Sequence, residues 1–243
     1  MLILLTGRAT RVARFVEQQS KTYLATVRLG QRTTTDDCTG QPVGNAAAVT
    51  SLTVEGVKAA LESMAGVQMQ TPPTYSAKKV AGERSYRLAR QGEAVTLAPV
   101  EVRLHRLDLL GIDLPDVTVR ATVSAGTYIR AIARDLGEAL GVGGHLASLR
   151  RESIGAIRVD DAVPLAELPS PPQLRPLIDV LGHLQGVELT AEEVEDVSHG
   201  RPVRREAPVP GAEFVRLMAA TDVIGIARPD GEWLRPVVVL VGT

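Results

Sequence analysis

The 243-residue sequence has little of several features that mark common classes of protein. Its one cysteine, Cys38, rules out a disulfide within the chain, as is typical of a protein from a reducing cytoplasm. No apolar run has the length that a helix needs to cross a bilayer, and the apolar start MLILL lacks the charged lead-in and cleavage site of a signal peptide. We therefore expect a cytoplasmic protein that makes no membrane contact.

The usual catalytic patterns are absent as well. The four histidines are scattered, and no pair of His, Cys or acidic residues has metal-ligand spacing, so the sequence predicts no metal and no cofactor. It contains neither a glycine-rich phosphate loop before a helix nor a nucleophile elbow. Acidic neighbours in TTTDDCTGQ disfavour the thiolate form of Cys38. Generic catalytic templates therefore do not fit.

Charge is distributed unevenly behind a net charge of −1. Residues 1–110 hold 14 Lys+Arg against 9 Asp+Glu, residues 111–178 hold 7 against 8, and residues 179–243 hold 6 against 11. The first part therefore has the charge to meet a polyanion, whereas the acidic last part does not.

The segment QTPPTYSAKKVAGERSYRLARQG, residues 70–92, combines two prolines, the basic pair Lys78 and Lys79, two tyrosines and a short basic helix. Such a segment is expected to project rather than pack. Cations suit phosphates and aromatic rings suit unstacked bases, so the pattern favours nucleic acid. A solvated loop and helix is the alternative that this segment alone leaves open.

Hydrophobic periodicity predicts an α+β chain of strands and amphipathic helices. LILL has the pattern of a buried strand, and Thr53 is a good N-cap for a helix that buries one side and ends near Gly66. A proline-rich break, PLAELPSPPQ, precedes a boundary near residue 178. After it we expect a small β-rich unit, opened by a helix with a Thr190/Glu193 capping box and containing two strands joined by RPDGEW. The predicted elements in the first part are helices at 9–19, 54–66 and 129–140 and strands at 22–30, 100–110, 117–123 and 145–159.

The stretch SAGTYIRAIARDLGEALG sets Arg130 in the first turn of a predicted helix, where the helix dipole is already positive. Arg130 lies off the apolar stripe of that helix, so core packing does not explain it. A strand, a turn and a helix start carrying Tyr128 and Arg130 form a plausible anion site. An exposed arginine paired with a surface carboxylate is the alternative.

Four blocks, in order, resemble the TruB-type tRNA pseudouridine synthases. They are GRATR with KTYLATVRLGQRTTTDDCTGQ, then TPPTYSAKKVAGERSYRLARQG, VSAGTYIRAIARDLGEALG and GGHLASLRRESIG. The resemblance implies a mixed, largely antiparallel pseudouridine-synthase core over residues 1–178, with an RNA-gripping insertion at about 70–92. It also implies a small PUA-like C-terminal RNA-binding domain over residues 179–243.

The resemblance implies an isomerase that converts the T-loop uridine at position 55 of tRNA to pseudouridine after flipping the nucleotide out. The catalytic residues implied are Tyr23, which stacks on the base, and Arg130, which pairs with a nucleophilic aspartate. Tyr128 and Leu149 complete the base pocket, and Lys78 and Lys79 grip the T-arm. A monomer is expected, with tRNA as the partner.

In the family the nucleophilic aspartate lies in a G-T-L-D-P stretch just before the segment that this sequence opens with. No such stretch occurs in these 243 residues, and Asp36 and Asp37 belong to the loop after the tyrosine strand. We therefore expect a core truncated at its N-terminus, by a late start codon, a fragment or a true paralogue, and no catalysis by the chain as given. A non-catalytic tRNA-binding protein or RNA-folding chaperone is the alternative function.

Overall fold

The computed structural model describes residues 1–80, 82–91, 97–205 and 211–241, except for the side chains of Lys79, Val80 and Arg90. Its contacts divide the chain into two compact units, residues 20–153 and residues 1–19 with 154–243. The sequence instead predicts a domain boundary near residue 178. That boundary stays a prediction, because the two units are defined by contacts within the structure. Residues 1–19 join the second unit because Val12, Phe15 and Val16 share an apolar cluster with Val180 and its neighbours.

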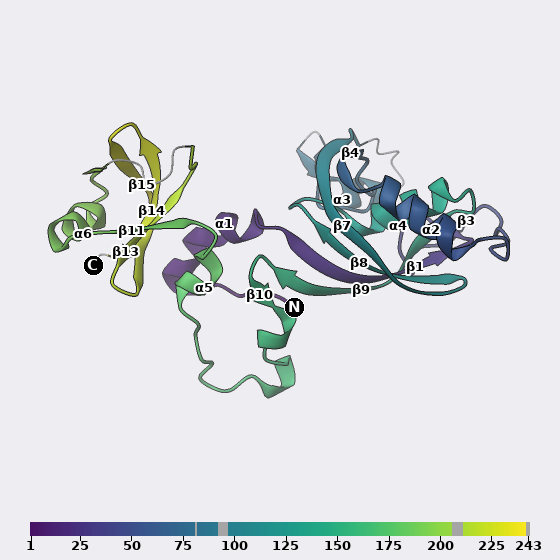
Figure 1. The fold of residues 1–243 in the computed structure, drawn as a ribbon, viewed down its shortest axis with the longest axis horizontal. Helices are drawn as coiled ribbons and strands as arrows, with labels where there is room; N and C mark the ends of the chain where they lie inside the picture. The colour runs from purple at the N-terminus through teal and green to yellow at the C-terminus, as the bar shows by residue number, and fades with distance from the viewer. Residues whose placement is uncertain (81, 92–96, 206–210, 242–243) are drawn as a thin grey trace. The chain divides into compact units, whose positions relative to one another are not determined.

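An antiparallel sheet forms the unit of residues 20–153 (Figure 1). Its strand order is β9-β1-β8-β7-β4, and the short β10 (Ile157–Arg158) follows β9 at the edge. β1 pairs antiparallel with β8, β8 with β7, and β7 with β4. Four of its strands match the predicted strands 22–30, 100–110, 117–123 and most of 145–159: β1 (Lys21–Leu29), β7 (Val100–Asp113), β8 (Asp116–Val123) and β9 (Gly144–Ile154). The fifth, β4 (Gly66–Gln70), was not predicted.

One face of this sheet is covered by two helices, α2 (Val54–Ser63) and α4 (Ile129–Ala139). Alternate residues of β1 and β8 form the core with them, as the period of two predicts. The Thr53 hydroxyl accepts a hydrogen bond from the Gly56 N–H at 3.1 Å, which confirms the predicted N-cap. Val54 does not face the core; it is 54% exposed.

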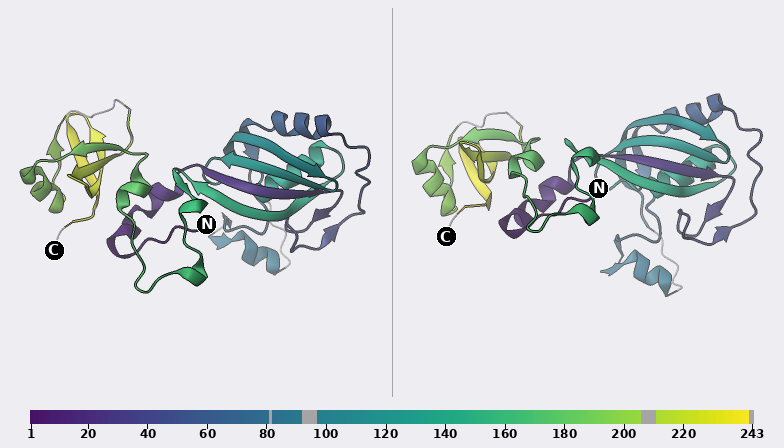
Figure 2. Two further views of the ribbon diagram at one scale, coloured as in Figure 1. Left: turned by 60° about the horizontal axis from the view of Figure 1, so that its bottom comes forward. Right: turned by 90° about the horizontal axis from the view of Figure 1, so that it is seen from below.

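A projecting arm, residues 71–99, leaves the sheet between β4 and β7 (Figure 2). It carries a hairpin of β5 (Lys79–Val80) and β6 (Glu83–Arg84), followed by the short α3 (Ser85–Arg90). The main chain of the arm folds back on itself, because the Ser85 N–H donates to the Lys78 carbonyl and the Tyr86 N–H to the Ser76 carbonyl. The arm therefore has the basic, projecting form that the sequence predicts, with Ala81 and residues 92–96 outside the described part.

A loop of residues 30–53 connects β1 to α2 and contains the two-stranded ladder of β2 (Arg32–Thr33) and β3 (Pro42–Val43). Its segment around residue 37 lies beside β9, since the Cys38 N–H donates to the Leu146 carbonyl at 2.9 Å and the Leu146 N–H to the Asp36 carbonyl at 3.0 Å. These bonds bring Asp36 and Asp37 to the edge of the sheet unit near α4.

The second unit contains a five-stranded sheet of order β11-β13-β14-β15-β12 and the helix α6 (Ala191–Ser198). Its strands are β11 (Gln185–Glu188), β12 (Val203–Arg204), β13 (Val215–Ala219), β14 (Asp222–Asp230) and β15 (Trp233–Val239). The predicted capping box is present, with both the Thr190 and Glu193 hydrogen bonds formed. β14 and β15 pair across the predicted turn, at Asp230 and Trp233.

Short helices complete this unit: η1 (Gly7–Val12), α1 (Ala13–Glu17), η2 (Val159–Asp161), η3 (Leu165–Glu167) and α5 (Leu177–Leu181). η1 and α1 lie within or beside the helix predicted at 9–19. Together with the sheet they form a small β-rich unit, as the sequence predicts for the C-terminal part.

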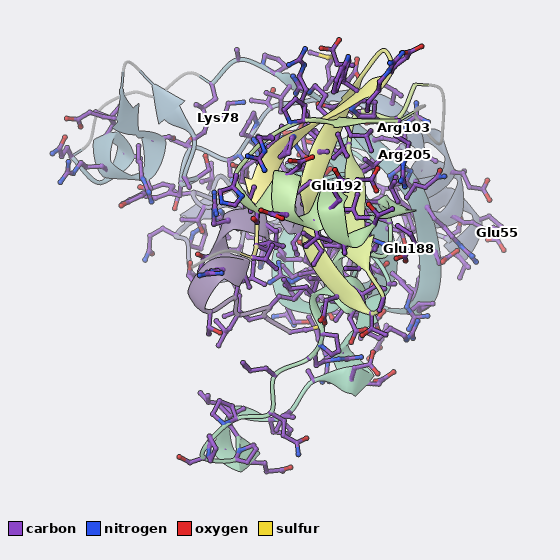
Figure 3. All side chains as sticks on the ribbon, turned by 90° about the vertical axis from the view of Figure 1, so that its left-hand side faces the viewer. Glu55, Lys78, Arg103, Glu188, Glu192 and Arg205 are labelled. Atoms are coloured by element: carbon purple, nitrogen blue, oxygen red, sulfur yellow. The ribbon has the colours of Figure 1, made fainter. Side chains whose placement is uncertain are left out.

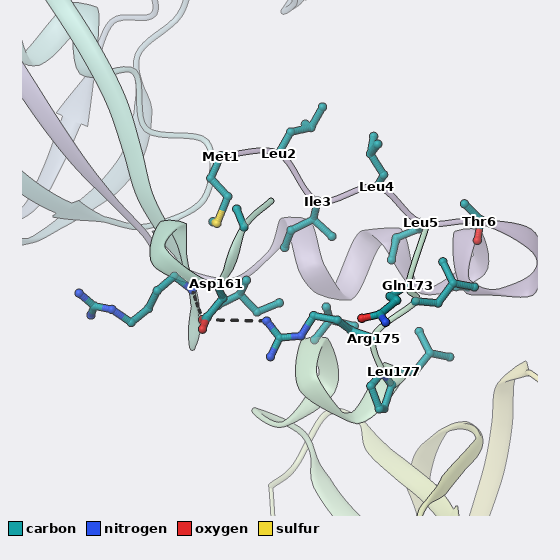
Figure 4. Close-up of a pocket in the computed structure, with 17 residues that line it drawn as sticks. Met1, Leu2, Ile3, Leu4, Leu5, Thr6, Asp161, Gln173, Arg175 and Leu177 are labelled. Carbon is teal, nitrogen blue, oxygen red and sulfur yellow. Dashed lines mark hydrogen bonds and ion pairs between the residues drawn. The ribbon is translucent and has the colours of Figure 1, made fainter. Parts of the chain in front are cut away.

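The prediction of a buried strand at LILL is wrong. Residues 1–6 belong to no strand of the described chain, and Leu2 and Leu4 are 71% and 73% exposed. Ile3 and Leu5 point the other way, against the apolar cluster of α1 and α5 (Figure 4). Alternation of this kind needs a hydrogen-bonded partner strand before it becomes a sheet, and none of the described strands pairs with it.

Candidate active site

The start of α4 is held by a buried glutamine at the end of β4. Tyr128 occupies the N-cap position, and its side chain makes no capping hydrogen bond. The Tyr128 N–H instead donates to Gln70 Oε1 at 2.8 Å, and Gln70 Nε2 donates to the Tyr128 carbonyl at 3.2 Å. Gln70 is 4% exposed, so this pair of bonds is shielded from water and fixes the main chain at Tyr128.

Arg130 contacts two segments, the loop after β1 and the arm. Its Nη1 pairs with Asp37 Oδ2 at 3.0 Å and also donates to the Thr35 carbonyl, while Nη2 donates to the Tyr75 carbonyl at 2.8 Å. The side chains of Arg130 and Asp37 are 24% and 20% exposed, so the pair is not an exposed surface salt bridge. Arg130 thus has a carboxylate partner within the described chain, Asp37, and its pairing with the nucleophilic aspartate of the family stays a prediction.

Asp37 is held as a carboxylate by four contacts. Besides Arg130, its Oδ1 accepts hydrogen bonds from the Thr35 hydroxyl at 2.7 Å and from the N–H and hydroxyl of Thr39 at 3.0 and 2.6 Å. Burial acts to raise the pKa of Asp37, but the Thr39 and Thr35 bonds and the Arg130 charge outweigh it and lower the pKa. Asp37 is thus ionised and fixed in orientation.

Two adjoining pockets share Arg130 and Thr39 as a common wall. The first has a volume of about 600 Å³, within the usual range for small-ligand sites, and is lined by Thr35, Thr39, Tyr75, Ser76, Ala77, Tyr86, Tyr128 and Arg130. The second is lined by Asp37, Cys38, Thr39, Arg130 and Leu146–Leu149. Of the residues that the sequence singles out, Arg130 lines both pockets, Tyr128 lines the first and Leu149 lines the second.

Tyr23 lies on β1, partly buried against the core, and lines neither pocket. A hydrogen bond of 2.8 Å between the Ser148 and Thr26 hydroxyls joins β9 to β1, one residue from Leu149 and three from Tyr23. Tyr23 therefore lies on the strand next to the one that carries Leu149.

Lys78 lies on the arm, as Figure 3 shows, two residues from the pocket-lining Ser76. The main chain of Lys79 lies in β5, but its side chain is outside the described part of the structure. The arm thus carries basic residues next to the first pocket's Tyr75 and Tyr86, and the proposed grip of Lys78 and Lys79 on RNA stays a prediction.

A second arginine on α4 forms a network one helical turn beyond Arg130. Arg134 pairs with Asp36 Oδ2 at 3.0 Å and Asp135 Oδ1 at 2.8 Å, and its Nη2 donates to the Thr71 carbonyl at 3.0 Å. Burial raises the pKa of both Asp36 and Asp135 above the usual range, and the charge of Arg134 opposes that rise. Arg134 therefore stabilises two desolvated carboxylates.

Sequence reasoning set Asp36 and Asp37 aside and missed Gln70 and Arg134. A signal for Asp37 was present, since the loop RTTTDDCTG, residues 32–40, fits the R-T-x-T-x-D-x-x-G pattern of the resembled family with Asp37 at its acidic position. Gly40, which closes that pattern, has room for no side chain: a Cβ would lie 2.5 Å from the Thr35 hydroxyl. The local pattern did not show that this loop reaches α4, since 93 residues separate Asp37 from Arg130.

Within the described ranges, no three His, Cys, Asp or Glu side chains are grouped closely enough to hold a metal ion. In the same part of the chain, no helix has the length and apolar character to cross a membrane.

The described residues form a tyrosine-lined pocket with a carboxylate-paired arginine next to a basic arm, and the family comparisons assign this chain to the pseudouridine-synthase class of RNA-modifying isomerases. Residues 1–129 match the TruB family pseudouridylate synthase N-terminal domain. Residues 130–171 match the tRNA pseudouridylate synthase B C-terminal domain, and residues 186–240 match a pseudouridine synthase II TruB C-terminal domain. The chain belongs to the TruB family of pseudouridine synthases.

Curated relatives agree with this assignment. The chain is 40% identical over 248 residues to tRNA pseudouridine synthase B of Mycobacterium bovis (strain BCG / Pasteur 1173P2), covering 99% of this chain and 82% of that protein. It is 38% identical over 255 residues to the protein of that name from Mycobacterium leprae (strain TN), covering 99% and 78%.

Solved structures confirm the fold. The structure described as an H/ACA RNP bound to a substrate RNA containing 2'-deoxyuridine matches with a TM-score of 0.70 at 18% identity, over 96% of this chain and 70% of that one. A Cbf5-Nop10-Gar1 complex matches with a TM-score of 0.70 at 20% identity, over 97% and 70%. The α+β class with a β-rich C-terminal part is therefore confirmed.

Proposed function

We propose that this synthase acts on tRNA, and that its target is the T-loop uridine at position 55. The observation that carries the proposal is the meeting of Tyr128, Arg130 and Leu149 at two adjoining pockets beside a basic arm. Relatives that cover almost the whole chain are named tRNA pseudouridine synthase B. The pocket volume of about 600 Å³ suits one nucleotide rather than a duplex.

A uridine within a folded loop reaches such a pocket only when it leaves its stack. Unstacking costs on the order of a few kcal/mol, which contacts of the arm with the RNA offset. In our proposal Tyr23 stacks on the flipped base, Tyr128 and Leu149 line its pocket, and Lys78 and Lys79 bind phosphates of the T-arm. Because rings and cations bind through different forces, these two groups of contacts are separable by experiment.

The isomerisation detaches uracil from C1' of the ribose and rejoins it through carbon C5, and a carboxylate nucleophile starts that exchange in the family. Arg130 is placed to hold a carboxylate ionised and oriented, as its pairing with Asp37 illustrates. The family's G-T-L-D-P context does not occur among these 243 residues. We therefore expect the 243-residue polypeptide to bind tRNA without converting it.

Binding of a T-arm RNA hairpin by the 243-residue chain tests the substrate assignment. We expect the hairpin to bind at least about tenfold more tightly than a hairpin with the same stem and an unrelated loop, a difference of about 1.4 kcal/mol. Fluorescence anisotropy with labelled hairpins measures both constants. Equal affinities would remove the T-loop from the proposal and leave only nonspecific RNA binding.

Incubation of unmodified tRNA with the same polypeptide tests the assignment of the nucleophile. We expect no pseudouridine by mass spectrometry of nuclease digests. Turnover that is abolished by Asp37→Asn would make Asp37, which already contacts Arg130, the nucleophile instead. Binding without turnover fits both a polypeptide that needs the missing aspartate and the alternative of a tRNA-binding protein or chaperone. Acceleration of tRNA refolding by the chain would favour the chaperone.

We further propose that the protein works as a monomer in the cytoplasm. The single cysteine supports a reducing compartment. Separately, the excess of acidic residues in 179–243 argues against strong binding of RNA phosphates by that segment. Sedimentation of the chain alone and with one equivalent of hairpin tests the stoichiometry. A dimer peak without RNA would contradict the monomer.

A further inference from the structure

Two arginines one helical turn apart on α4 contact the same two segments of the chain. Arg130 binds Asp37 in the loop and the Tyr75 carbonyl in the arm. Arg134 binds Asp36 in the same loop and the Thr71 carbonyl at the start of the arm. The adjacent aspartates Asp36 and Asp37 thus pair with different arginines, Asp37 with Arg130 and Asp36 with Arg134.

The backbone at Asp36 makes this division possible. Asp36 has a left-handed conformation with a φ of 59°, which aspartate and asparagine tolerate better than most residues. The turn directs the Asp36 carboxylate to Arg134 while the next carboxylate, Asp37, meets Arg130. The side chains of Asp36 and Arg134 are 15% and 14% exposed, so water screens their charges weakly.

Asp36 is the neighbour of Asp37 in the loop, and its carboxylate pairs with Arg134, one helical turn beyond Arg130. Burial raises the pKa of Asp36, and the charges of Arg134, Arg130 and Arg32 oppose that rise. Asp135, the other partner of Arg134, is the next residue of α4 itself. Of the two carboxylates that Arg134 neutralises, Asp36 is therefore the one that belongs to the loop that Arg130 binds.

We propose that Arg134 is a positioning residue, which binds Asp36 and so leaves Arg130 with Asp37 as its carboxylate partner in the substrate pocket. The inference rests on the proposed RNA-binding function of that pocket. Without Arg134, the Asp36 carboxylate competes with the adjacent Asp37 for the guanidinium of Arg130, because both carboxylates lie in the loop that Arg130 contacts. The side chain of Arg130, which lines both pockets, is then displaced.

Matched second-site changes separate this role from a merely structural one. Arg134→Gln removes the cation from two partly buried carboxylates, Asp36 and Asp135, and we expect it to bind the T-arm hairpin about tenfold more weakly than wild type. Adding Asp36→Asn removes the competitor for Arg130, so the double variant is expected to bind within about threefold of wild type. Adding Asp135→Asn removes one buried charge as well, but it is expected to leave binding weak.

Arg120→Gln serves as the control for loss of one positive charge, because Arg120 pairs with Glu152 on the sheet and is 44% exposed. It is expected to bind the hairpin as wild type does. Circular dichroism melts of all variants show whether each is folded at the assay temperature. Equal rescue by Asp36→Asn and Asp135→Asn, or wild-type binding by Arg134→Gln, would overturn the proposal.

A measurement without RNA keeps the inference distinct from the proposed function. Arg130→Gln and Asp36→Asn are combined as a double-mutant cycle, read from amide hydrogen exchange of residues 31–44. Coupling between them is expected to be at least about fivefold larger, as a ratio of exchange rates, in the Arg134→Gln background than with Arg134 present. Equal coupling in the two backgrounds refutes the role of Arg134, whereas failure of wild type to bind the hairpin refutes the function proposed for the pocket.

Discussion

The ion pair between Arg130 and Asp37 should contribute measurably to the stability of the sheet unit. In Asp37→Asn the amide oxygen keeps the bonds from Thr35 and Thr39, whereas the ion pair with Arg130 is lost and an N–H donor replaces the oxygen that accepted from Arg130 Nη1. A hydrogen bond to a charged group contributes about 1.5–3 kcal/mol net, and breaking a fully buried pair costs about 3–5 kcal/mol. Because both side chains keep a fifth or more of their surface exposed, we expect about 2 kcal/mol.

A double-mutant cycle with Arg130→Gln isolates the pair. The only tryptophan, Trp233, lies on β15 of the other unit, so its fluorescence does not report on this site. Native-state hydrogen exchange does, through the Cys38 and Leu146 amides that hold the loop to β9. We expect both amides to lose protection in each single variant and no further in the double variant.

The exposed pair of Arg120 and Glu152 provides the comparison. Pairs of that kind contribute about 0–1 kcal/mol, so their coupling should be clearly smaller than that of Arg130 and Asp37. A coupling energy at the Arg130–Asp37 pair no larger than at the exposed pair would contradict the claim that the partly buried ion pair stabilises the sheet unit.

Other predictions concern the arm, the core, the C-terminal unit and pH. Replacing Lys78 and Arg87 by Gln should weaken hairpin binding and reduce the slope of log affinity against log salt by about 0.7–0.9 for each phosphate that the arm no longer binds, in anisotropy titrations. Leu61→Ala, at a site 1% exposed, should cost about 2–5 kcal/mol in urea unfolding followed by circular dichroism. Thr190→Ala should cost about 0.5–2 kcal/mol, seen by Trp233 fluorescence, and leave hairpin binding unchanged. The folded-state pKa of Asp37 lies below its usual value, so its contribution to stability should be complete above that usual value and disappear as pH falls through the lowered one. Wild type and Asp37→Asn should therefore converge in stability as the pH is lowered below about 4, in urea unfolding measured over a pH series.

Much of the sheet unit was predictable because its elements are strongly periodic. Val117, Val119, Ala121 and Val123 alternate inward on β8, and α4 presents Ile129, Ile132 and Leu136 to the same core. These patterns depend only on which face is buried, so the sequence displays them locally.

The interactions that assemble the site were not predictable in that way. Asp37 and Arg130 meet only because the loop is attached to β9 by main-chain hydrogen bonds that leave no mark on side-chain pattern. At residues 2–5 a strand was predicted that does not form. Their side chains alternate as in a strand, but no described strand pairs with their backbone. Periodicity reports burial; it does not report what a segment is bonded to.

The contacts that root the arm on α4 have a consequence for how such enzymes diverge. Arg130 and Arg134 hold the arm through the main-chain carbonyls of Tyr75 and Thr71, and every residue type supplies such a carbonyl. The side chains farther along the arm are therefore free to change without loosening its attachment. An arm transplanted from a relative with another RNA preference should therefore attach to this helix through the same carbonyls and transfer the RNA specificity of that relative.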